Sequence, residues 1–104
     1  MTDFILVSTT TETEQAAQKI AKALVEQRLA ACVQVAGPIY SAYRWQGEVQ
    51  SSQEWLCTAK TRRTLFAQVE KAIAELHSYD CPEIIATPIT DGSSAYLAWL
   101  GHEL

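Results

Sequence analysis

Basic residues are scarce in this 104-residue chain, and their scarcity excludes one large class of partner. Eight lysines and arginines stand against twelve aspartates and glutamates, which gives a formal net charge of −4. A face that binds nucleic acid has to replace the counterions of the phosphate backbone with clustered positive charge. The only such cluster here is Lys60 to Arg63, so we expect no nucleic-acid partner.

Long hydrophobic runs and a regular cysteine framework are lacking as well. The apolar run Phe4–Val7 falls far short of the roughly 20 residues that cross a bilayer, and no basic segment precedes it. We therefore expect neither a membrane span nor a signal peptide. The three cysteines, Cys32, Cys57 and Cys81, are widely spaced and odd in number. This pattern is typical of reduced thiols and predicts a cytoplasmic location.

Two segments have the periodicity of amphipathic helices, and each begins at a threonine. The first follows the run at Phe4–Val7, which is typical of a strand buried on both faces, and it begins with a capping-box spacing at Thr11. The second is expected to begin at a Thr61 cap and to end near His77. The apolar stripes predict that both helices pack on a sheet.

A long hairpin is predicted between these helices. Extended segments over residues 29–45 and 49–60 flank Gln46-Gly47, a pair that is typical of hairpin turns, and Gly37-Pro38 interrupts the first arm. Cys32 and Cys57 fall in the middle of these strands and are expected to belong to the core. Both arms are long enough to extend past that core. The aromatic side chains exposed on such arms favour contact with a partner.

The chain ends with a fourth strand over residues 83–89, which Pro88 marks as an edge strand, and with a short helix capped by Ser93 or Ser94. The order β-α-β-β-α-β, followed by this helix, predicts one α+β domain over residues 1–104 with ferredoxin-like topology. Two helices cover only one face of its four-stranded antiparallel sheet. We therefore expect the chain to associate with copies of itself.

Two short segments carry residues that could bind a ligand. His77 and Cys81 are four residues apart, and an imidazole with a thiolate would suit copper or zinc. The same spacing is more often that of a histidine at a helix C-terminus beside a small buried cysteine. Lys60-Thr61-Arg62-Arg63 would form an anion site if it opens a helix, or else a solvated helix start.

An ordered set of segments resembles the CutA family, the divalent-cation tolerance proteins. The resemblance covers nearly the whole chain and rests on Leu29-Ala30-Ala31-Cys32-Val33, Tyr43-Arg44-Trp45-Gln46-Gly47, Glu54, Lys60-Thr61, His77-Ser78-Tyr79-Asp80-Cys81-Pro82-Glu83-Ile84 and Tyr96-Leu97-Ala98-Trp99. It implies a ferredoxin-like subunit in a tight homotrimer that is similar to the PII signalling proteins and lies in the cytoplasm. The phenotype linked to the family is tolerance to copper and other divalent metals.

The resemblance also implies site residues, which are carried over one by one. In members proposed to bind copper, the candidate ligands are a cysteine closing the first strand and two adjacent histidines. Ser8 and Leu76 stand at two of these positions here, so that His77 alone is kept, and Cys81 could supply a second donor. The family further implies a cleft between subunits for a small anionic or zwitterionic ligand. Besides His77, that cleft would be lined by Trp45, Glu54, Lys60, Tyr79, Glu83 and Trp99.

Two other functions remain as alternatives. A PII-like sensor would bind a nucleotide or metabolite between subunits through Lys60, Arg62 and Arg63. Acylphosphatases share the expected subunit order but use a glycine-rich loop with an arginine after the first strand. Residues 8–11 are a serine and three threonines, so that chemistry is disfavoured. We expect a binding protein and not an enzyme.

Overall fold

The computed structural model describes residues 1–104 and contains a single four-stranded sheet with helices. The elements are β1 (Phe4–Thr11), α1 (Glu14–Glu26), β2 (Cys32–Trp45), β3 (Glu48–Arg62), a short 3-10 turn (Arg63–Leu65), α2 (Phe66–Leu76), β4 (Ile85–Pro88) and α3 (Ser94–His102). The strands are antiparallel in the order β2-β3-β1-β4. This arrangement confirms the predicted α+β, ferredoxin-like fold. No helix is long and apolar enough to cross a membrane.

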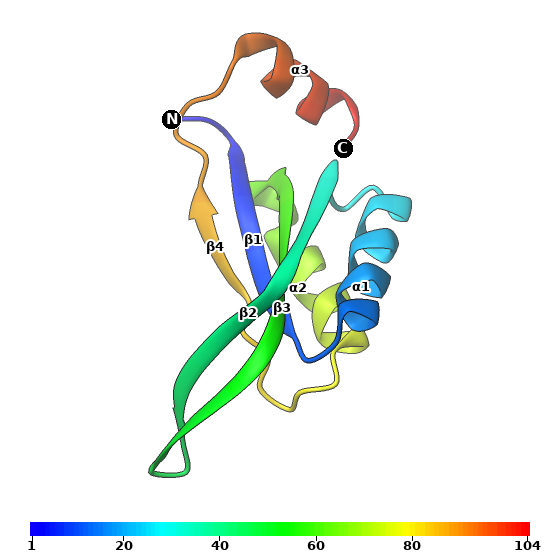
Figure 1. Ribbon diagram of the computed structural model, residues 1–104. Coiled ribbons are helices and arrows are strands. Elements are labelled where there is room, and N and C mark those ends of the chain that lie inside the picture. Colours follow the sequence, from blue (N-terminus) through cyan, green and yellow to red (C-terminus); the bar gives the residue numbers. More distant parts are fainter.

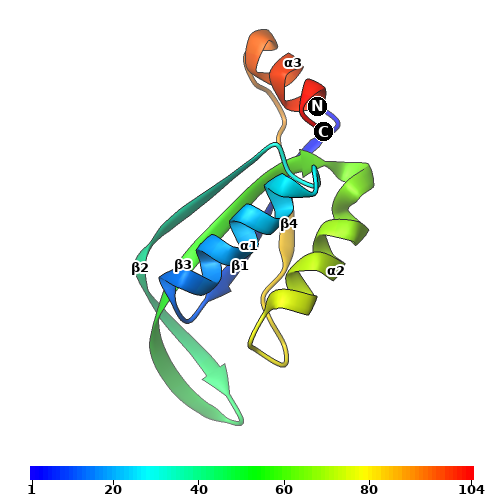
Figure 2. The same cartoon turned by 90° about the vertical axis from the view of Figure 1, so that its right-hand side faces the viewer.

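One face of the sheet carries α1 and α2, as Figure 2 shows. Alternate side chains of β1 point to this face, and Ile5 and Val7 are almost fully buried there. They pack in one hydrophobic cluster with residues of both helices, among them Ile20, Leu24 and Ile73. Cys57 belongs to the same cluster, as the sequence predicts, whereas Cys32 stands at the start of β2, is only partly buried and lies outside the cluster. The core therefore lies between the sheet and two helices, and the opposite face has no helix over its centre.

The end of the sheet that lies away from the hairpin tip is covered by α3 (Figure 1). Leu100 is fully buried there, and Arg62 on β3 donates to the carbonyl oxygen of Gly101 at 3.2 Å. The same guanidinium lies 5.2 Å from the ring centroid of Phe4. Ser93 caps α3 by accepting a hydrogen bond from the amide of Tyr96, as predicted.

The β2–β3 hairpin extends well past the helices, which confirms the expectation from its long arms (Figure 1). Residues 42–51 are all exposed, and the molecule measures 45 × 25 × 23 Å. Gln46 and Gly47 both have positive φ angles, 51° and 82°, and form the two-residue turn between the paired residues Trp45 and Glu48. The pairing register shifts between Ala36 and Ile39, where Gly37-Pro38 was expected to interrupt the strand.

Both threonine caps predicted for the long helices are wrong. Thr13 caps α1 and accepts a hydrogen bond from the amide of Ala16 at 3.1 Å, whereas Thr11 is buried at the end of β1. Thr61 is fully buried within β3, and its hydroxyl donates to the carbonyl oxygen of Leu29 at 2.6 Å. Both β1 and β3 continue further along the chain than the apolar runs from which they were predicted. The predicted start of β2 is also early, because the strand begins at Cys32 and not at Leu29.

Candidate functional site

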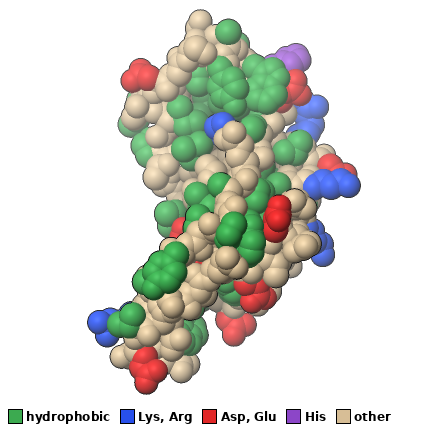
Figure 3. All heavy atoms as spheres, viewed as in Figure 1, with side chains coloured by type: hydrophobic (Ala, Val, Ile, Leu, Met, Phe, Trp, Pro, Cys, Tyr) green, Lys and Arg blue, Asp and Glu red, His purple; other side chains and the backbone are tan.

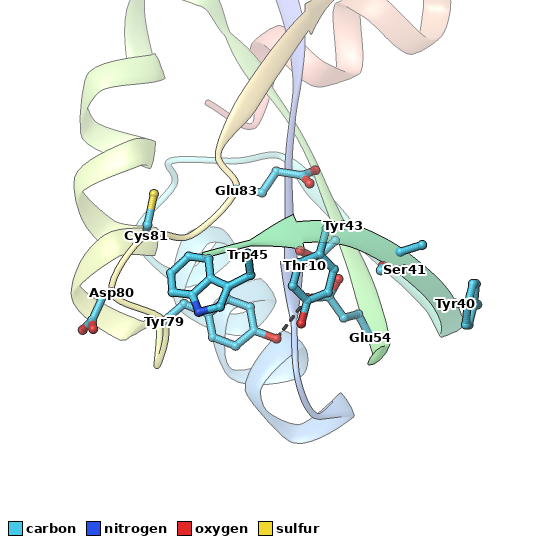
Figure 4. A pocket seen from close by; sticks show the side chains of 11 residues that line it. Thr10, Tyr40, Ser41, Tyr43, Trp45, Glu54, Tyr79, Asp80, Cys81 and Glu83 are labelled. Carbon is cyan, nitrogen blue, oxygen red and sulfur yellow. Dashed lines mark hydrogen bonds between the residues drawn. The ribbon is translucent and has the colours of Figure 1, made fainter. Parts of the chain in front are cut away.

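A pocket of about 670 Å³ opens where the segment that follows α2 meets the hairpin. Figure 4 shows its side chains, which come from the end of β1, from the outer half of the hairpin and from the connection to β4. The pocket is lined by Thr10, Tyr40, Ser41, Ala42, Tyr43, Trp45, Glu54, Tyr79, Asp80, Cys81 and Glu83. Three of these residues carry a carboxylate, one carries a thiol, and none is a lysine or an arginine.

Glu54 and Tyr79 form the best-defined contact in this pocket. The Tyr79 hydroxyl donates to Oε2 of Glu54 at 2.9 Å, the bond drawn as a dashed line in Figure 4. Glu54 is only 8% exposed although it carries a charge. Burial, and then the hydrogen bond and charge of Glu54, raise the pKa of the Tyr79 phenol far above its ordinary value. The phenol therefore keeps its proton and stays a donor to the carboxylate.

His77, which does not line the pocket, contacts both Thr10 and Tyr79. Its Nε2 lies 2.7 Å from the carbonyl oxygen of Thr10, and its Nδ1 accepts the amide hydrogen of Tyr79 at 3.1 Å. Because a carbonyl oxygen can only accept, Nε2 carries the proton and Nδ1 supplies the lone pair. The two rings lie 4.7 Å apart. Both ring nitrogens are thus used in fixing the loop.

The predicted metal pair, His77 and Cys81, is not brought together around an open site in one chain. Cys81 is exposed and lines the pocket, whereas His77 does not line it. No group of three or more histidine, cysteine, aspartate and glutamate side chains in the chain could hold a metal ion. Ser8, which the resemblance places at the end of the first strand, lies inside β1, which continues to Thr11. Metal binding by His77 and Cys81 stays a prediction.

The cleft predicted from the resemblance is divided between two places in a single chain. Trp45, Glu54, Tyr79 and Glu83 line the pocket, as expected. Lys60 lies instead beside α3, where its Nζ donates to Oε1 of Gln34 at 3.0 Å and contacts the Tyr96 hydroxyl at 3.4 Å. Trp99 lies there too, because its ring is 5.5 Å from that of Tyr96. The pocket of one chain therefore lacks the lysine that an anionic ligand was expected to meet.

Residues 60–63 do not open the second helix, so both readings of this segment, an anion site at a helix start and a solvated helix start, are wrong. Lys60, Thr61 and Arg62 belong to β3, and α2 begins only at Phe66. Alternate residues of a strand point to opposite faces, so these side chains do not converge on a helix N-terminus. Arg62 contacts α3, and Thr61 is buried.

Sequence reasoning missed several members of the pocket. Tyr43 lines it and was not named for the cleft, although it stands two residues from the predicted Trp45 on one strand, so the two share one face. This spacing is a signal that the sequence contains. The contribution of Thr10 and Tyr40 depends on how the hairpin crosses β1, and no local pattern predicts it.

Comparison with known proteins gives a consistent result over almost the whole chain. The model of a family described as CutA1 divalent ion tolerance protein matches residues 5–103. The divalent-cation tolerance protein CutA of Thermus thermophilus is 46% identical over 100 residues, which are 96% of this chain and 95% of that protein. The chloroplastic protein CutA of Arabidopsis thaliana is 44% identical over 96 residues. These are 92% of this chain, which spans about half of that longer protein (53%).

Solved structures agree with this match. The crystal structure of CutA from Xylella fastidiosa superposes with a TM-score of 0.94 at 34% identity and covers 98% of both chains. The structure of the Thermus thermophilus protein gives a TM-score of 0.91 at 46% identity, over 93% of this chain and 94% of the other. The fold described above is therefore shared over almost the whole chain.

Proposed function

We propose a function for this chain on the basis of its family, because it belongs to the CutA1 divalent ion tolerance protein family. It acts in divalent-cation tolerance as a cytoplasmic binding protein and not as an enzyme. The observation that carries this proposal is the charge of the pocket. Asp80, Cys81 and Glu83, the rim residues, are exposed along the connection to β4 without forming a three-donor cluster, and no lysine or arginine lines the pocket. Carboxylates and a thiolate are donors for divalent cations, and the thiolate suits copper.

We further propose that the metal site is completed by self-association into a homotrimer. One chain offers fewer than three clustered donors, and a second copy could supply the rest. Support for association comes from the surface, where Val49, Ile85, Tyr96 and Trp99 are between 41% and 73% exposed. Figure 3 shows apolar side chains gathered over α3 and along the hairpin on the face that α1 and α2 leave open. Light scattering of the purified protein measures this directly, and a monomer would contradict it.

Calorimetric titration with Cu²⁺, Zn²⁺ and Mg²⁺ tests the metal proposal. Glu83→Gln and Cys81→Ser each remove one donor of the rim, so we expect the Kd for the preferred ion to rise about tenfold in either variant. Asp91→Asn is the matched control, because Asp91 is an exposed carboxylate outside the pocket. Equal affinities in all three variants, or no binding of any ion, would overturn the proposal.

The PII-like alternative is tested in the same titration with ATP. Two of its three proposed contacts are already engaged, because Lys60 bonds Gln34 and Arg62 bonds Gly101. We therefore place it second. Strong ATP binding together with no metal binding would reverse that order.

A further inference from the structure

The loop between α2 and β4, residues 77–84, carries the rim residues and is attached to β1 at both of its ends. At its start, Nε2 of His77 donates to the carbonyl oxygen of Thr10 at 2.7 Å. At its end, Ile85 begins β4 and pairs with Ser8. The rim residues therefore lie on a short stretch of chain between two attachments to one strand.

A third attachment lies inside the loop, at Tyr79. Its amide hydrogen is accepted by Nδ1 of His77 at 3.1 Å, and its hydroxyl donates to Glu54 at 2.9 Å (Figure 4). Asp80, the first residue of the rim, follows directly in the chain. All of these hydrogen bonds join residues of one chain, so association of copies is not needed to form them. The path of the chain into the rim therefore depends on the ring of His77.

The two hydrogen bonds leave no nitrogen of His77 free to bind a metal ion. A metal coordinates imidazole through the lone pair of an unprotonated nitrogen. Here Nε2 carries the proton that is donated to Thr10, and the lone pair of Nδ1 accepts the amide hydrogen of Tyr79. Coordination would therefore break one of the bonds that hold the loop. The side chains of Cys81 and Glu83, by contrast, are exposed.

We infer that His77 is the positioning residue of the rim and is not one of its metal ligands. Its ring joins β1 to Tyr79 and so fixes the chain from which the donors project. Less conformational freedom is then lost when an ion binds. This role rests on the proposed function, because it takes the rim as the metal site. It reverses the part that the resemblance implies for His77, which is that of a ligand.

Two substitutions of His77 separate positioning from coordination. His77→Ala removes both hydrogen bonds. His77→Asn keeps the one to Tyr79, because an asparagine side-chain oxygen accepts the amide hydrogen two residues further along the chain. Both variants lack the imidazole, so a ligand role predicts equal loss of affinity, whereas a positioning role predicts recovery in His77→Asn. His102→Asn is the matched control, because His102 is the other histidine and lies exposed on α3.

Calorimetric titration of the full-length protein with Zn²⁺ is the first measurement. We expect the Kd to rise about tenfold in His77→Ala, to stay within about threefold of the parent in His77→Asn, and to be unchanged in His102→Asn. Nitrogen NMR of labelled histidine adds a spectroscopic signature, since coordination shifts the resonance of the bound nitrogen. Zn²⁺ should leave both nitrogens of His77 unshifted. A shifted nitrogen, or equal Kd values in the two His77 variants, would overturn the inference.

Hydrogen exchange of the Tyr79 amide tests the loop without any metal. This amide should exchange slowly in the parent and in His77→Asn, and about tenfold faster or more in His77→Ala. The amides of the β1–β3 ladder should stay protected in all three proteins, which shows that the variants are folded. Unchanged exchange of Tyr79 in His77→Ala would refute the positioning role. Release of this amide in His77→Ala, with no Zn²⁺ binding to the parent, would refute the proposed function while supporting the attachment of the loop by His77.

Discussion

Replacing Tyr79 by phenylalanine removes one hydroxyl from the pocket and leaves its ring in place. That hydroxyl is the only donor to the buried carboxylate of Glu54. A hydrogen bond to a charged group contributes roughly 1.5–3 kcal/mol, and loss of the donor leaves the carboxylate without compensation. Because Glu54 lines the pocket, water relieves part of this cost. We expect the Tyr79→Phe variant to lose about 2 kcal/mol of unfolding free energy.

A second background separates the bond from other effects of the change. In Glu54→Gln the acceptor is neutral, and a neutral hydrogen bond contributes only about 1 kcal/mol. Tyr79→Phe should therefore cost about half as much in that background as in the parent, a coupling of about 1 kcal/mol. Tyr43→Phe removes a hydroxyl from the same pocket that makes no hydrogen bond within the chain, and it should cost less than about 0.5 kcal/mol.

Urea denaturation at one fixed protein concentration measures these differences, since association would otherwise change the apparent stability. Equal costs of Tyr79→Phe in the two backgrounds would refute the reasoning, because the bond to the charged carboxylate would then not be its source. A cost of Tyr43→Phe as large as that of Tyr79→Phe would refute it as well.

Three further predictions concern the core and the hairpin. Burial raises the pKa of the Cys57 thiol from 9.0 to about 11. Its contribution is therefore complete below pH 9, and about 2–3 kcal/mol is lost as the pH rises to 11. Because the raised pKa of Tyr79 also lowers stability above pH 10 in both proteins, urea denaturation should show a loss about 2–3 kcal/mol larger in the parent than in Cys57→Val. Thr9 is almost fully buried and its hydroxyl has no partner, so Thr9→Val should raise the unfolding free energy by about 1 kcal/mol, and a destabilised variant would contradict this. A Cβ on Gly37 would lie 2.5 Å from a ring carbon of Trp55, so thermal melts of Gly37→Ala should show a loss of about 1–3 kcal/mol, whereas an unchanged melt would mean that the ring moves freely.

The sequence predicts the order of the elements because each depends on a local pattern. Residues within a few positions determine the apolar stripes of α1 and α2 and the turn at Gln46 and Gly47. The helix starts could not be predicted in the same way. Thr11 and Thr61 are of a residue type that often caps helices. The pairing of β1 with β3, however, extends both strands through these residues and buries them. Long-range pairing decided the outcome there.

In the candidate site, too, some residues could be predicted from the sequence and others depend on contacts between distant parts of the chain. Trp45, Glu54, Tyr79 and Glu83 could be named in advance because a family resemblance carries them, and the structure brings them to one pocket. Lys60 could not be separated from them by sequence alone, since only the sheet register places its side chain beside Gln34 and Tyr96. The roles of the two nitrogens of His77 likewise depend on the carbonyl of Thr10, 67 residues away along the chain.

The residues that line the pocket differ in how firmly the rest of the fold holds them. Thr10 and Glu54 are buried beside the core, whereas Tyr43 and Trp45 are carried by a two-stranded arm that projects from it (Figure 1). Substitutions along the arm can therefore change which ligands are accepted while the folding free energy stays almost constant. Substitutions at the base alter both at once. Selection can thus diversify ligand preference in this chain on one side of a cavity while it preserves the other.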